Sequence, residues 1–126
     1  MNIAFICILV MGLMPIMFTG IAKFGSKRFN PADNHNPREF RAKLDGWPKR
    51  ANWAQLNSFE AFPLFVAAVL IASYNHAPQR TIDIIAMIVV GLRIIYGVLY
   101  IADKASLRSL VWFISLGFTI SLFFIA

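Results

Sequence analysis

The sequence predicts an all-α integral membrane protein, a four-helix up-down bundle built as a single domain over residues 1–126. Two observations predict this fold class. Hydrophobic residues make up 59% of the 126 residues and charged residues only 14%, whereas soluble domains carry about 25% charged residues. The apolar residues also fall into four blocks, each near the roughly 20 residues that a helix needs to cross a bilayer. Four such spans use nearly the whole chain, so we expect no separate soluble domain.

The expected spans are residues 3–24, 50–74, 82–102 and 108–126. The first span differs from a signal peptide, because no basic residue precedes its apolar run and no small-residue cleavage site follows it. We therefore expect this span to be retained as a helix. Pro15 should bend it, since proline removes one backbone donor.

Basic residues concentrate in the predicted loop at residues 25–49 and in the third connection, which carries Lys104 and Arg108. The second connection carries only Arg80. By the positive-inside rule the first and third connections face the cytoplasm, and both termini face the opposite side. The net charge of +6 reflects this topology and an attraction to the head groups of membrane lipids. We expect no nucleic-acid partner, because no basic stripe with interleaved aromatic residues lies outside the loop.

The first loop should contain one short helix, from Pro37 to Leu44. Asn36 is a suitable N-cap for it, and Pro37 suits its first turn. Gly46 then interrupts the helical pattern, and Pro48 suits the start of the second span.

Polar groups appear in the second span, where an apolar helix is expected. At about 3.6 residues per turn, one face of that helix carries Arg50, Trp53, Asn57, Glu60 and Leu64. A carboxylate inside a bilayer costs roughly 2.5–3.5 kcal/mol on insertion scales. A chain that keeps one there usually has a partner or a ligand for it, so this face is the predicted functional site.

The third span carries a second polar stripe, formed by Arg93, Tyr96 and Tyr100. In an up-down bundle the two stripes can meet at similar depth, and Glu60 could reach Arg93. Two interpretations stay open. The intramembrane charges could pair only to fix helix register or an oligomer. Alternatively, Asn57 and Glu60 form a pocket with the two tyrosines, because several hydrogen-bonding groups at one depth exceed what one helix contact requires.

Neither a metal site nor a reactive cysteine is expected. Asp33 and His35 could act as ligands, but His76 falls on the opposite side of the membrane and no third ligand has suitable spacing. Cys7 is the only cysteine, which excludes an internal disulfide. It lies in the first span with no base near it in the sequence.

The stretch from Arg50 to Phe65, RANWAQLNSFEAFPLF, resembles the second-helix signature of the MAPEG family, the membrane-associated proteins of eicosanoid and glutathione metabolism. That signature runs Arg-Ala-(His/Gln)-x-Asn-x-x-Glu, followed by an aromatic residue and Pro. The third span, with Arg93, Tyr96 and Tyr100, resembles the family's Arg-x-x-Tyr-x-x-x-Tyr. Length, four spans and the long first loop also agree, so the resemblance covers the whole chain.

The resemblance to this family, here to a small bacterial-type member, implies a homotrimer of four-helix subunits in the inner membrane. It implies a glutathione-dependent transferase or peroxidase acting on an apolar electrophile, with glutathione as thiol co-substrate at subunit interfaces near the cytoplasmic face. The glutathione-binding residues implied by position are Arg50, Gln55, Asn57, Glu60, Arg93, Tyr96 and Tyr100. Arg108 is the implied catalytic residue, because a cation stabilises the thiolate, which is the reactive nucleophile.

One position departs from the family's pattern. Trp53 stands where the signature has the arginine directly before Ala-(His/Gln), and an indole cannot bind a carboxylate as a guanidinium does. Arg50 lies one turn earlier and could substitute. The sequence therefore leaves open whether the ligand is glutathione, a different small thiol or a lipid-like molecule. The alternative function is a non-catalytic membrane protein that binds a lipid or a protein partner in the same pocket.

Overall fold

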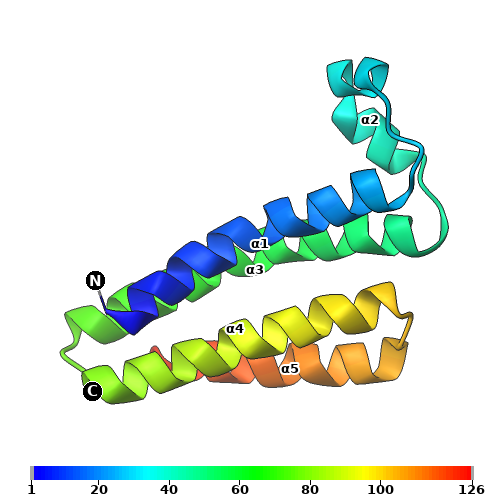
Figure 1. The fold of residues 1–126 in the computed structure, drawn as a ribbon. Coiled ribbons are helices and arrows are strands. Elements are labelled where there is room, and N and C mark those ends of the chain that lie inside the picture. The colour runs from blue at the N-terminus through cyan, green and yellow to red at the C-terminus, as the bar shows by residue number, and fades with distance from the viewer. Residues whose placement is uncertain (1, 126) are drawn as a thin grey trace.

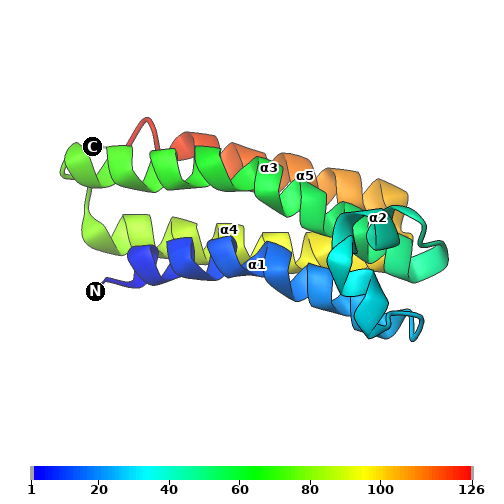
Figure 2. The same ribbon diagram turned by 90° about the horizontal axis from the view of Figure 1, so that it is seen from above.

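Four long helices lie side by side and form a bundle (Figures 1 and 2). The computed structural model describes residues 2–125, and all regular elements in that range are helices. The long helices are α1 (Ile3–Gly25), α3 (Gly46–Tyr74), α4 (Gln79–Ile101) and α5 (Ala105–Ser121). A 3-10 helix, η1 (Pro31–His35), and a short helix, α2 (Pro37–Ala42), lie in the first connection. The all-α prediction is confirmed.

Three of these helices, α1, α3 and α4, are long and apolar enough to cross a membrane. Helix α5 is also apolar but has only 17 residues. It is shorter than the predicted span 108–126 because the helix ends at Ser121 and turns follow. Helix α3 begins at Gly46, four residues before the predicted start at residue 50. Within residues 2–125 the structure therefore has three helices that are long and apolar enough to span a membrane and one shorter apolar helix beside them.

Small residues let α1 approach α3 and α4 closely. Ala54, Ala68 and Ala72 of α3 are fully buried in one cluster with Phe18 of α1. On α4, a Cβ added to Gly97 would lie 1.9 Å from Cζ of Phe18. Such small residues are the usual way for membrane helices to pack tightly. The most extensive packing in the bundle is therefore between α1 and α3.

Opposite ends of the bundle are organised differently. At the end where α1 begins, Oδ1 of Asp83 accepts hydrogen bonds from the backbone N–H of Ala4 at 2.9 Å and from Nε2 of Gln79 at 2.8 Å. A side chain of α4 thus satisfies a free donor in the first turn of α1. At the other end lie the long first connection and the α4–α5 turn (Figure 1).

The short helix of the first connection begins at Pro37, as predicted, but ends at Ala42 rather than Leu44. Asn36 is the N-cap residue, as predicted, but its side chain makes no capping hydrogen bond. Pro37 removes one of the backbone donors that such a cap would serve.

Candidate functional site

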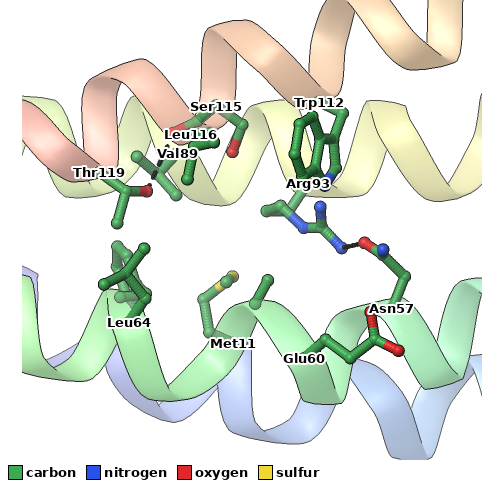
Figure 3. A pocket seen from close by; sticks show the side chains of 12 residues that line it. Met11, Asn57, Glu60, Leu64, Val89, Arg93, Trp112, Ser115, Leu116 and Thr119 are labelled. Carbon is green, nitrogen blue, oxygen red and sulfur yellow. Dashed lines mark hydrogen bonds between the residues drawn. The ribbon is translucent and has the colours of Figure 1, made fainter.

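Two neighbouring cavities lie between α3, α4 and α5. The inner cavity has a volume of about 150 Å³, and its polar lining residues are Asn57, Glu60, Arg93, Trp112, Ser115 and Thr119. The outer cavity, of about 230 Å³, is lined by Asn57, Tyr96, Arg108, Ser109, Trp112 and Phe113. The two cavities share Asn57 and Trp112, so these side chains lie at the boundary between them. Figure 3 shows the residues of the inner cavity on facing helices.

Arg93 is the central polar residue of the inner cavity. Its side chain comes from α4, it is only 3% exposed, and its Nη2 donates a hydrogen bond to Oδ1 of Asn57 on α3 at 2.6 Å (Figure 3). Its Nε is buried without a partner in the part of the chain that the structure describes. A hydrogen bond from a charged donor is stronger than a neutral one. Arg93 therefore fixes the orientation of the Asn57 amide.

The sequence allowed Glu60 to reach Arg93, and the structure gives a different pairing. Both residues line the inner cavity, but the hydrogen bond of Arg93 goes to Asn57. Among residues 2–125, no ion pair includes Glu60. The carboxylate lies on an exposed flank of α3 beside Leu56 and Phe59, which are also exposed. Glu60 is therefore available to a ligand or to a neighbouring chain.

Aromatic rings connect the two predicted polar stripes at the outer cavity. The rings of Tyr96 and Tyr100 meet edge to face at 5.7 Å, and Trp53 of α3 lies 6.2 Å from Tyr100. The guanidinium of Arg108, from α5, stands 4.2 Å above the ring of Tyr100. A cation over an aromatic face is attracted by the ring quadrupole. The structure thus brings Arg108, which lines the outer cavity together with Tyr96, over the ring of Tyr100.

Three predicted binding residues, Arg50, Gln55 and Tyr100, lie outside both cavities. Nε of Arg50 donates to the backbone carbonyl of Ile101 at 2.9 Å, so it satisfies a free acceptor at the end of α4. Gln55 is 5% exposed and its Oε1 has no hydrogen-bond partner within residues 2–125.

Sequence reasoning singled out Arg108 on α5 but missed the residues of this helix that line the inner cavity. Ser115 and Thr119 are the buried residues of this helix, and both line the inner cavity together with Trp112. Oγ1 of Thr119 donates to the carbonyl of Ser115 at 2.9 Å (Figure 3). Residues three and four apart share a helix face, so the spacing of 112, 115 and 119 predicts a common face. Because none of these residues is charged, the face did not stand out from the apolar residues around it.

The two cavities together are lined by two cations, Arg93 and Arg108, and one carboxylate, Glu60, all on apolar helices. Arg93 and Arg108 can hold or orient carboxylates and a thiolate, and Glu60 can accept hydrogen bonds from an ammonium group. Within residues 2–125, no three side chains of the types His, Cys, Asp and Glu gather as a metal site would require. The arrangement therefore suits a small zwitterionic ligand.

Comparison with known families gives one match. The model of the MAPEG family matches residues 3–126. This range includes all the helices and both cavities. No curated protein and no solved structure matches the chain.

Proposed function

The chain belongs to the MAPEG family, and from that membership we propose that it is a glutathione-dependent membrane transferase or peroxidase. The family contains enzymes of both kinds. The proposed substrate is an apolar electrophile that reaches the cavities from the bilayer. Glutathione is the thiol co-substrate and enters from the end of the bundle that carries the first connection and the α4–α5 turn. This end faces the cytoplasm of a bacterial inner membrane in the proposal, so both termini lie on the other side.

The observation that carries the proposal is the position of Arg108 at the outer cavity. Its guanidinium stands over Tyr100 and lines the same space as Asn57 and Tyr96. A positive charge there lowers the pKa of a bound thiol and raises the fraction of thiolate, which is the nucleophile. In the transferase reaction the thiol proton passes to solvent, sulfur forms a bond to the electrophilic carbon, and the leaving group departs with its electron pair.

The remaining residues hold the peptide. Glu60 accepts hydrogen bonds from the ammonium group of glutathione. Asn57 has its amide oxygen engaged by Arg93, so its NH₂ group is left to donate to a carboxylate of the ligand. Arg93 acts in this proposal as a positioning residue that sets the amide of Asn57. Tyr96 and Tyr100 supply hydroxyl groups next to Arg108.

Assembly as a homotrimer completes the proposed site. Glu60, Leu56 and Phe59 form an exposed strip on α3, and a carboxylate facing lipid costs roughly 2.5–3.5 kcal/mol. A second copy of the chain packed on this strip would remove that cost and enclose the ligand. Arg50 and Gln55 line neither cavity of the single chain, and Gln55 is buried inside it, so this proposal gives them no direct contact with the ligand.

A binding titration tests the proposal. Purified protein in detergent is titrated with glutathione, the absorbance of the thiolate is recorded, and conjugation of a chlorinated aromatic compound is measured. Glu60→Gln should weaken binding about 10- to 100-fold, because a hydrogen bond to a charged group contributes about 1.5–3 kcal/mol. Glu39→Gln, on exposed α2, is the matched control and should bind as wild type. Equal affinity in wild type and Glu60→Gln would contradict the role of Glu60, and absence of thiolate would end the enzymatic proposal.

A second candidate is a non-catalytic protein that binds a lipid or a protein partner in the same cavities. The observation that favours it is Trp53, which packs beside Tyr100 where the family signature has an arginine. Co-purified lipid together with no thermal shift on adding glutathione would support this candidate instead.

A further inference from the structure

The first connection forms a separate structure at one end of the bundle, which we call the arm and define as residues 26–45. It contains η1 and α2. In Figure 1 the arm projects sideways, across the direction of the long helices. Because the arm lies at one end of the long helices, a membrane crossed by those helices would have the arm at one of its surfaces.

Aromatic packing holds the arm in this position. The rings of Phe24 and Phe29 meet edge to face at 5.5 Å, and those of Phe29 and Phe40 at 5.1 Å. Nζ of Lys23 stands 4.5 Å above the ring of Phe29. Leu44 is buried in a small cluster with residues of α1 and α3. These contacts fix α2 to the bundle, so the charges of α2 have a defined place.

Helix α2 has one neutralised side and one basic side. Glu39 and Lys43, one turn apart, form an ion pair at 3.3 Å. Arg38 and Arg41 share a different side of the helix, three residues apart. Within residues 2–125, neither guanidinium has a carboxylate within 4.0 Å. Burial, followed by the neighbouring charge of Arg38, lowers the pKa of Arg41. The chain itself therefore leaves this pair of positive charges without a counterion.

Two exposed aromatic residues lie at the helix ends that flank the arm. Phe24 is 67% exposed at the end of α1, and Trp47 is 42% exposed at the start of α3. Aromatic residues at such positions are typical of the membrane–water interface. A soluble anion has no apolar region to contact these rings, whereas a phospholipid presents a phosphate and an apolar region side by side.

We propose that the arm binds anionic phospholipids, with Arg38 and Arg41 holding the phosphate groups and Phe24 and Trp47 lying at the head-group level. Guanidinium groups bind phosphate oxygens in a bidentate manner. The arm residues line neither cavity, so this proposal stands independently of the proposed enzymatic function.

Lipid retention by the intact protein tests the proposal. The full chain is placed in nanodiscs of phosphatidylcholine containing a minor fraction of phosphatidylglycerol, then extracted gently and weighed with its bound lipid by native mass spectrometry. Wild type should retain phosphatidylglycerol preferentially, and Arg38→Gln with Arg41→Gln should lower its apparent affinity about 25-fold, since each basic residue near an anionic surface contributes about fivefold. The preference should weaken at high salt.

The matched control is Glu39→Gln with Lys43→Gln, which removes the paired charges from the same helix and should leave the preference unchanged. An equal loss in the control, or full retention in the arginine variant, overturns the proposal. A second measurement separates lipid from free phosphate. The unfolding temperature is compared in phosphatidylcholine nanodiscs with added inorganic phosphate and in nanodiscs that contain phosphatidylglycerol. If the two raise the unfolding temperature equally, the site binds a soluble anion and the lipid proposal fails.

Discussion

Helices α1 and α5 are both apolar, yet they pack very differently on the pair α3 and α4. Helix α1 buries residues in every turn from Ala4 to Ala22. Helix α5 buries only Ser115 and Thr119, and it stands over the two cavities. We call these regions the packed half, where α1 meets its neighbours, and the open half, where α5 meets them.

The cause of the difference is the size and polarity of the facing residues. In the packed half the facing residues of α3 include several alanines, and Gly97 of α4 admits the ring of Phe18. In the open half Arg93 and Asn57 face the indole of Trp112 across the bundle (Figure 3). Because lipid is as apolar as a leucine side chain, apolar character alone does not bring membrane helices together. Helix α5 packs closely on α4 but makes little contact with α3, so the cavities of the open half lie between α5 and α3, and this is where chemistry is possible.

The largest effect is expected from Arg108→Gln in the open half. Loss of the charge at the outer cavity should lower the conjugation rate about 100-fold, as the loss of one electrostatic stabiliser of a developing or bound anion does. The thiolate absorbance of bound glutathione should disappear in the same variant. Lys104→Gln, in the turn before α5, removes the same charge nearby without touching a cavity. If the two variants behave alike, the rate depends on net charge rather than on the position of Arg108.

The packed half should respond in stability rather than in activity. Gly97→Ala places a methyl group where the ring of Phe18, itself 2% exposed, now lies. Overpacking of this kind costs about 1–3 kcal/mol in free energy of unfolding, measurable by detergent-induced denaturation. Gly91→Ala is the control on the same helix, since no atom lies within 4 Å of its added methyl group. A comparable loss in both variants would show that Gly97 matters for a reason other than contact with α1.

The hydrogen bond between Arg93 and Asn57 crosses the open half and should couple the two residues. A double-mutant cycle with Arg93→Met and Asn57→Leu should give a coupling free energy of about 1–2 kcal/mol, since hydrogen bonds to charged groups exceed neutral ones. Arg93→Lys should weaken glutathione binding while leaving the thiolate of the remaining bound ligand unchanged. Additive stability changes in the cycle would mean that the bond does not form in the membrane.

Much of this architecture follows from the sequence, because it depends on local patterns. Apolar blocks predict the long helices, and helical spacing places Asn57 on one polar stripe and Arg93 on another, which the structure joins by a hydrogen bond. The choice of Asn57 over Glu60 as partner of Arg93 depends on side-chain reach at a particular helix crossing. No periodicity contains that information.

The arm and α5 were predictable only in part, for a related reason. Pro37 predicts the start of α2. The sideways direction of the arm depends instead on the packing of Phe24, Phe29 and Phe40. The stripe of Ser115 and Thr119 carries no charge, so it did not stand out from the apolar residues around it. A charged residue in an apolar segment, such as Arg93, is visible in a sequence pattern. A hydroxyl group that is hydrogen-bonded to a carbonyl of its own helix, such as that of Thr119, is not.

The smallest effect is expected from restoring the arginine that the family signature has at position 53. Trp53→Arg should tighten glutathione binding about fivefold in a calorimetric titration, because a guanidinium can bind a carboxylate bidentately. The gain stays small because Nζ of Lys49 lies 5.3 Å from the ring of Trp53 and its like charge opposes the new one. Trp53→Gln is the control, since it removes the indole without adding charge. A gain in both variants would mean that the ring merely obstructs the ligand, and a gain in neither would favour a cavity shaped for a lipid.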